Sequence, residues 1–259
     1  MIRRVLATAL GAAGLYLAVC AFFFFAQRAM VFPAPPGERP APAAGTVVRG
    51  DGFRALDAPV TDARGTVVLF HGNGEDLADA GAMIALWQGL RFSVFAVEYP
   101  GYGVARDLGS PSRKGIVASA DRALSWLRAR GARDEVMVLQ GQSLGTAVAA
   151  EMARKGFGSR LVLISPFTSV MELGRRVVPW LPAGLLVRDR FDTAAIAPEV
   201  RQPVLIVHGT ADEVVPVEMG TRLAGEFPRA QLRLISGAHH NDLLASHAAE
   251  IRAAIAAQF

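Results

Sequence analysis

A single stretch, Val136–Ala147, narrows the possible folds more than any other. In it a β-branched apolar run ends in Gly-Gln-Ser-Leu-Gly and continues into an Ala-rich helical pattern. This order predicts a strand, a sharp turn and a helix. In so tight a turn the backbone of Ser143 is strained and its hydroxyl points outward, while Gly141 and Gly145 leave room where a Cβ would collide. The amide of Leu144 then lies at a helix N-terminus, where free N–H groups favour an oxyanion.

Strand-like and helical patterns alternate along most of the chain. Apolar runs predict strands at 46–49, 56–60, 66–71, 92–98, 136–140, 161–165, 203–208 and 232–235. Helical spacing predicts helices at 77–90, 116–130, 144–155, 217–227 and 242–257. Continuous apolar strands that alternate with helices are what a mostly parallel sheet covered on both faces requires. We therefore expect one α/β domain, in which the context of Ser143 favours a nucleophile over an ordinary serine turn.

The N-terminus carries an apolar segment of membrane-spanning length. Arg3 and Arg4 precede residues 5–26, which are almost free of polar side chains. A helix of about 22 residues spans about 33 Å, enough to cross the hydrocarbon core. We expect residues 1–27 to be an uncleaved, single-pass signal anchor, with the arginines in the cytoplasm and the catalytic domain on the outer side of the membrane. Cleavage near Cys20, as in a signal peptide, is the alternative.

Two further segments do not follow the alternation of strands and helices, one before it and one within it. Residues 28–45 hold five prolines without hydrophobic periodicity and predict an extended linker, so that residues 46–259 form the globular domain. At about 167–199 an insertion combines Trp180 and aliphatic side chains with four arginines. It stands where a short cap over the site would be inserted, and an apolar cap with an arginine rim suits acyl-chain substrates. An ordinary packed excursion is the alternative.

Composition argues against several other classes of protein. The net charge is +4, but the basic residues are scattered without a basic stripe, which argues against nucleic acid as a partner. Cys20 is the only cysteine, so the chain has neither a disulfide framework nor a thiolate metal site. The glycine-rich residues 71–74 lack a phosphate-binding fingerprint. The sequence implies no metal and no organic cofactor.

A serine nucleophile needs a base within hydrogen-bond reach, itself oriented by a third group. His239 and His240 lie between the last strand and the last helix, at the sheet edge where the serine turn also emerges. His71 and His208 end strands, a position typical of loop bracing, and His247 lies within the last helix.

The orienting acid is expected between serine and histidine along the chain. Asp212 follows the strand that ends at residue 208 and fits best. The weaker candidates are Asp189 and Asp192 in the insertion and Asp242 at the start of the last helix. The second oxyanion donor is expected from the loop at 71–74, whose glycines let the backbone turn toward the serine. We expect it to be the backbone N–H of Asn73, with the neighbouring glycine at 74 as the alternative.

At these residues the chain resembles the α/β-hydrolase superfamily over roughly residues 46–259. The resemblance rests on four ordered pieces: His71-Gly72-Asn73-Gly74, Gly141-Gln142-Ser143-Leu144-Gly145, His208-Gly209-Thr210-Ala211-Asp212 and His240-Asn241-Asp242. Three more pieces are similar to membrane-anchored serine hydrolases such as depalmitoylases and monoacylglycerol or lysophospholipid lipases: Tyr99-Pro100-Gly101-Tyr102-Gly103, Pro111-Ser112 and Phe191-Asp192. In that branch the catalytic histidine precedes Asn-Asp, which selects His240, although His239 stands here where the branch has glycine.

The resemblance implies a serine hydrolase that cleaves carboxylic ester or thioester bonds of small-molecule or lipid substrates. Its expected catalytic residues are Ser143, Asp212 and His240, with Leu144 and Asn73 at the oxyanion hole. A proline-releasing aminopeptidase of the same fold is the nearest alternative, and a large cap with acidic residues would favour it. A catalytically silent, membrane-tethered binding domain is the alternative from another class.

Overall fold

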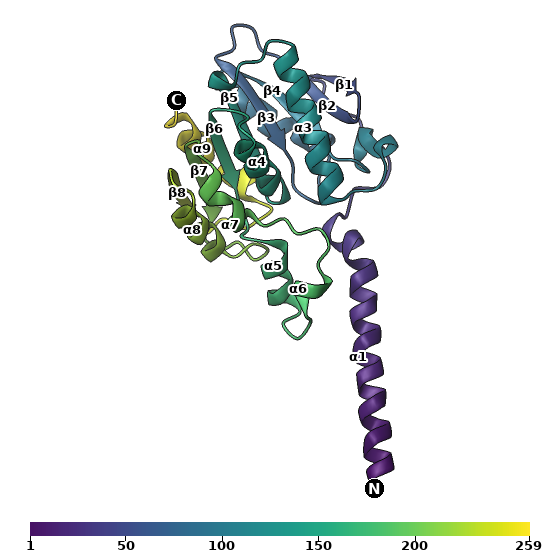
Figure 1. Ribbon diagram of the computed structural model, residues 1–259. Coiled ribbons are helices and arrows are strands. Elements are labelled where there is room, and N and C mark those ends of the chain that lie inside the picture. Colours follow the sequence, from purple (N-terminus) through teal and green to yellow (C-terminus); the bar gives the residue numbers. More distant parts are fainter.

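The computed structural model describes residues 1–259 and has one eight-stranded sheet in the order β1-β2-β4-β3-β5-β6-β7-β8 (Figure 1). The strands are β1 (Thr46–Gly50), β2 (Phe53–Ala58), β3 (Gly65–Phe70), β4 (Phe92–Glu98), β5 (Met137–Gln142), β6 (Arg160–Ile164), β7 (Val204–Gly209) and β8 (Ala230–Ile235). β2 pairs antiparallel with β1 and with β4, and all other pairs are parallel. The predicted mostly parallel sheet is confirmed, with the antiparallel pairs at one edge.

Helices cover both faces of this sheet. Successive strand residues point to opposite sides and are apolar on both, so each face has to be buried. One face packs against α3 (Arg113–Ala129), α4 (Leu144–Arg154) and α8 (Val217–Glu226), and the other against α2 (Gly81–Gln88) and α9 (Leu243–Ala256). In β3, Val68 and Phe70 belong to the first core and Val67 and Leu69 to the second. This two-sided burial explains why the strands are apolar without alternation. Short 3₁₀ turns are η1 (Leu77–Ala80), η2 (Gly103–Leu108), η3 (Asp134–Val136) and η4 (Ala197–Glu199).

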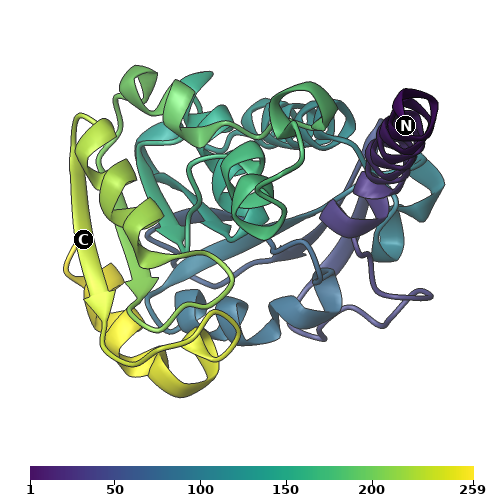
Figure 2. The same ribbon diagram turned by 90° about the horizontal axis from the view of Figure 1, so that it is seen from below.

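The insertion between β6 and β7 folds into α5 (Val170–Val177), α6 (Ala183–Leu186) and α7 (Thr193–Ile196). α5 begins where the Ser169 side chain accepts the N–H of Glu172, and α7 begins where Asp192 accepts the N–H of Ala195. Figure 2 shows the molecule from below, with this segment in front of the sheet and α1 seen nearly end-on beside it.

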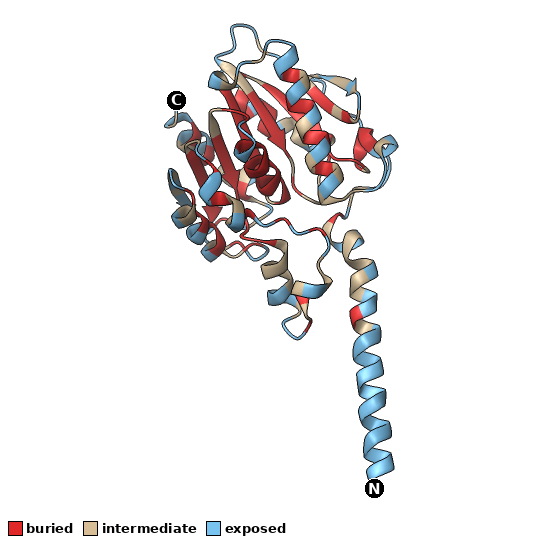
Figure 3. Ribbon diagram, viewed as in Figure 1, coloured by how far each residue is buried: buried red, intermediate tan, exposed pale blue.

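The N-terminal helix α1 (Ile2–Val31) projects away from the sheet and is exposed over most of its length (Figure 3). It has an 18-residue window of mean hydropathy 2.1, and both a membrane anchor and a signal sequence have such length and composition. The helix runs beyond residue 27 and ends beside the insertion. Phe32 then packs against Phe191, with ring centroids 6.2 Å apart and both side chains buried, so the chain enters the domain beside the insertion.

Candidate active site

Ser143 lies in the turn between β5 and α4 with φ 49° and ψ −115°, a strained conformation for a residue with a side chain. A Cβ on Gly141 would stand 2.2 Å from the carbonyl oxygen of Gly145, and one on Gly145 would stand 2.0 Å from that of Phe70. Both positions therefore require glycine. The turn that the sequence predicted is present, and it holds the serine at the carboxyl edge of the sheet.

Loops after three different strands bring Ser143, His240 and Asp212 together. His240 Nε2 lies 3.1 Å from Ser143 Oγ, and His240 Nδ1 lies 2.8 Å from Asp212 Oδ2. The other carboxylate oxygen of Asp212 accepts the N–H groups of Val214 at 3.0 Å and Val215 at 2.7 Å. These two bonds fix the plane of the carboxylate, so that its free oxygen faces the imidazole.

The environment of Asp212 keeps it ionised. Burial raises its pKa, but hydrogen bonds with His208, with His240 and with the N–H of Val215 outweigh this effect and hold the pKa of Asp212 well below its usual range. His208 is fully buried, and its Nε2 lies 2.8 Å from the carbonyl oxygen of Val215 and 3.4 Å from Asp212 Oδ2. His208 thus braces the acid from behind, in keeping with the bracing role expected for it.

The remaining histidines do not reach Ser143. His239 Nδ1 bonds Glu213 at 3.0 Å, and both side chains are 56% exposed. His71 lies under the sheet edge, where Nδ1 contacts the carbonyl of residue 72 at 2.7 Å and Nε2 contacts Glu98 at 2.9 Å. Burial lowers the pKa of His71, but the hydrogen bond and charge of the Glu98 carboxylate outweigh this effect and raise the pKa above its ordinary value. His247 pairs with a glutamate in its own helix.

The alternative acids are also engaged elsewhere. Asp189 accepts from Arg28 Nε at 2.9 Å, Asp192 accepts an N–H at the start of α7, and Asp242 accepts the N–H of His239 at 2.8 Å. None of them has a hydrogen bond with His240, so Asp212 alone among the sequence candidates pairs with that ring.

The loop after β3 lies against the serine. A Cβ built on Gly72 would stand 3.8 Å from Ser143 Cβ, and Asn73 follows directly. The carbonyl of Asn73 accepts the Tyr102 hydroxyl at 2.9 Å, which holds this peptide in place. Leu144 is the first residue of α4, where backbone N–H groups have no partner within the helix. The backbone of both proposed oxyanion donors therefore lies next to the nucleophile.

Glu75 joins this loop to the serine turn, a role that sequence analysis missed. One carboxylate oxygen accepts the N–H of Gly72 at 2.7 Å and the other accepts Gln142 Nε2 at 3.1 Å. Gln142 is the residue directly before Ser143. Gln142 occupies a position of the Gly-x-Ser-x-Gly motif where any residue type is allowed, and Glu75 follows the loop as an ordinary carboxylate. Neither residue could therefore be recognised as functional from the sequence.

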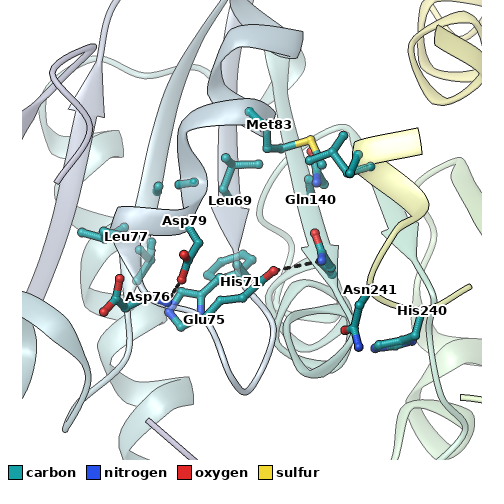
Figure 4. Close-up of a pocket in the computed structure, with 18 residues that line it drawn as sticks. Leu69, His71, Glu75, Asp76, Leu77, Asp79, Met83, Gln140, His240 and Asn241 are labelled. Atoms are coloured by element: carbon teal, nitrogen blue, oxygen red, sulfur yellow. Dashed lines mark hydrogen bonds between the residues drawn. The ribbon is translucent and has the colours of Figure 1, made fainter. Parts of the chain in front are cut away.

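Two cavities meet the site, and they differ in polarity. One cavity, of about 230 Å³, lies beside His240 (Figure 4) and combines apolar side chains with Glu75 and His71 on one side and Gln140 and Asn241 on the other. Its further carboxylates, Asp76 and Asp79, are both bonded to Arg39. An apolar cavity of about 300 Å³ reaches Ser143, and 15 of its 19 lining residues are hydrophobic. They include side chains of α5, of α6 and, unexpectedly, of α1.

Comparisons with known proteins agree with this fold. The family described as "Serine aminopeptidase, S33" matches residues 61–191. "Uncharacterized protein MT2364" of Mycobacterium tuberculosis is 32% identical over 238 residues, which cover 86% of this chain and 84% of that protein. The mouse "Alpha/beta hydrolase domain-containing protein 17C" is 34% identical over 183 residues, 70% of this chain and 55% of the relative.

Solved structures show the same fold. A monoacylglycerol lipase of Paleococcus ferrophilus superposes with a TM-score of 0.60 at 24% identity, over 80% of this chain and 97% of that one. The Pyrococcus furiosus esterase Pf2001 superposes with a TM-score of 0.68 at 14% identity, over 86% and 94%. The strained serine turn, the sheet and the family match define an α/β hydrolase. The chain belongs to the α/β-hydrolase family, and within it resembles the domain-containing protein 17 relatives over 70% of its length.

Proposed function

We propose that this protein is a serine hydrolase that cleaves carboxylic ester or thioester bonds through an acyl-enzyme. The observation that carries the proposal is the pair of distances at His240, 3.1 Å to Ser143 Oγ and 2.8 Å to Asp212 Oδ2. An imidazole that touches a serine hydroxyl with one nitrogen and a buried carboxylate with the other is arranged to act as a general base.

The reaction follows from this geometry. His240 Nδ1–H donates to Asp212, which leaves Nε2 free to take the Ser143 proton as Oγ attacks the substrate carbonyl carbon. The N–H groups of Leu144 and Asn73 donate to the oxyanion, and each lowers the activation barrier by on the order of 3 kcal/mol. The imidazolium then protonates the departing alcohol or thiol, and water attacks the acyl-enzyme by the same steps with His240 again as base.

The cavity at Ser143 supports an acyl substrate over a peptide. It is lined by aliphatic and aromatic side chains and by no carboxylate. An aminopeptidase needs a negative group to hold the free amine of its substrate, and the acids of the cavity beside His240 are already bonded to Arg39, Gly72 and Gln142. An intact set of nucleophile, base and acid argues against a silent binding domain.

Labelling by a fluorophosphonate, which needs an activated serine, tests the proposal. The full chain in detergent micelles is expected to be labelled at Ser143 and to hydrolyse p-nitrophenyl esters, while Ser143→Ala loses both. A folded protein that neither labels nor hydrolyses any ester is a silent binding domain. Preference for a proline p-nitroanilide over esters identifies a peptidase.

We further propose that α1 is a membrane anchor with the catalytic domain on the outer side. The length and hydropathy of α1 support an anchor, and Arg3 and Arg4 favour a cytoplasmic N-terminus. In sealed spheroplasts, external protease is expected to remove the catalytic domain and leave a membrane-bound N-terminal fragment. Release of an intact shortened protein into the medium would indicate a cleaved signal.

A further inference from the structure

We propose that the part of α1 from Tyr16 to Val31 forms one wall of the acyl-binding cavity, and that the substrate is a long-chain acyl ester or thioester embedded in the leaflet beside it. This inference rests on the proposed hydrolase function and on the proposed anchor. It assigns to α1 a part in substrate binding that a tether does not have.

One face of α1 lines the cavity. The residues are Phe23, Gln27, Met30 and Val31, which follow the i, i+4, i+7, i+8 spacing of a single helix face. The opposite wall comes from α5 and α6, and the floor comes from Ser143 and Leu144. The cavity is thus a slot between α1 and the insertion that ends at the nucleophile.

Polar bonds hold the two walls together. Gln27 Nε2 donates to the carbonyl of Leu186 at 3.0 Å, and Gln27 Oε1 accepts the N–H of Arg188 at 2.8 Å. Arg28 Nε bonds Asp189 at 2.9 Å, and the Asp189 side chain is only 8% exposed. A buried carboxylate needs such a partner. These bonds fix the rotation of α1 about its axis and its position along that axis relative to the insertion. A helix that serves only as a tether needs none of them.

The contact extends far along α1. The Tyr16 hydroxyl donates to the carbonyl of Trp180 at 3.1 Å, with the two rings 6.4 Å apart. From Tyr16 to Arg28 the helix rises about 18 Å, more than half of a hydrocarbon core of about 30 Å. If residues 5–26 cross the bilayer, the tip of the insertion lies inside the near leaflet.

The surface of that tip agrees with this position. Three large apolar side chains are exposed there, Val177 at 78%, Trp180 at 55% and Leu185 at 83%. The exposed Arg175 and Arg176 stand beside them on α5, with side chains long enough to reach toward the headgroups. In water the three apolar side chains form an unfavourable patch beside the cavity, whereas in the leaflet they are solvated by lipid. The guanidinium of Arg188 lies 5.3 Å from the ring of Phe24, nearer the domain, at the level where lipid headgroups begin.

An acyl chain therefore has a direct path from the leaflet. It slides between α1 and the α5–α6 wall with its methyl end in the lipid, and its carbonyl reaches Ser143 at the domain end of the slot. A short, water-soluble ester reaches Ser143 without using this slot, so the two substrate classes respond differently when the α1 wall is changed.

Met30→Trp tests the wall by filling the slot from the α1 side. In the full chain in lipid nanodiscs, we expect the ratio of kcat/KM for a hexadecanoyl ester to that for an acetyl ester to fall at least tenfold. Phe25→Trp is the matched control, because Phe25 is 78% exposed on another face of α1, and it should keep the wild-type ratio. Equal ratios in the two variants would overturn the inference.

A photoreactive inhibitor gives a second measurement that does not depend on how the variant folds. A long-chain alkyl fluorophosphonate with a diazirine in the middle of its chain, which the inference places between the two walls, is bound to Ser143 of the wild-type protein and irradiated. Crosslinks within residues 16–31 and 170–187 are expected. Crosslinks confined to other segments would overturn the inference while leaving the hydrolase proposal intact, and absence of Ser143 labelling would instead overturn the hydrolase proposal and this inference with it.

Discussion

Two histidine–carboxylate pairs stand next to each other in this molecule, His240 with Asp212 and His239 with Glu213. Both rings bond through Nδ1, at 2.8 Å and 3.0 Å. The first pair is 9% and 0% exposed at its side chains, the second 56% at both. The first pair faces Ser143, which lies 3.1 Å from His240 Nε2, and the second faces solvent. The contrast shows that burial and direction, rather than pairing alone, distinguish the site.

The largest expected effect comes from removing each ring in turn. His240→Ala should lower kcat by about 10⁴-fold or more, because no other base reaches Ser143 Oγ. His239→Ala should change kcat less than about threefold, since its ring contacts only an exposed carboxylate. Hydrolysis of a p-nitrophenyl ester by both variants measures the difference. Loss of activity in His239→Ala with activity kept in His240→Ala would reverse the assignment of the base.

The acids should show the same contrast at a somewhat smaller scale. Asp212→Asn should lower kcat by about 10⁴-fold, because an amide no longer fixes the tautomer of His240. Glu213→Gln should leave kcat within about twofold. Hydrolysis of a p-nitrophenyl ester measures both effects.

The stability of the protein should also depend on pH through Asp212. Since the pKa of Asp212 in the folded protein lies below the unfolded value of 3.8, the stabilising effect of this carboxylate is present above pH 3.8. It is lost as the pH falls toward the folded pKa. Unfolding in urea at several pH values tests this, and a wild-type advantage that grows on acidification would contradict it.

The next prediction concerns His208, which lies behind Asp212 in the buried pair and has no counterpart behind Glu213. A Cβ on Gly220 would stand 2.3 Å from His208 Nδ1, so Gly220→Ala should push the ring toward Asp212 and lower the free energy of unfolding by about 1–3 kcal/mol. Gly225→Ala in the same helix meets nothing within 4 Å and should raise it by about 0.5–1 kcal/mol. Denaturant melts compare the two, and equal effects would show that His208 is free to move.

Much of this arrangement could be predicted from the sequence because it is local. The eight strands, the turn at Ser143 and the loops that carry Asp212 and His240 are each specified by patterns within a few residues. The resemblance to a family selected His240 over His239, and the structure places that ring against the serine.

The rest depends on contacts between distant segments, which leave no periodic signal. α6 and α7 have four residues each, too short for a helical pattern. The bond between Gln27 and Leu186 joins residues 159 positions apart, so the apolar N-terminal run could be read as a membrane segment but not as a wall of the cavity. Glu75 joins two loops in the same way.

The smallest expected effect concerns the exposed pair itself. The hydrogen bond with Glu213 raises the pKa of His239 above its ordinary value. Removing that bond in Glu213→Gln should bring the pKa of His239 back toward its ordinary value, and added salt should weaken the shift in the wild-type protein because the pair is open to solvent. NMR titration of the ring protons measures both changes. A pKa of His239 that neither the substitution nor salt alters would mean that another group holds this ring, and the contrast between an exposed and a buried pair would then need a different basis.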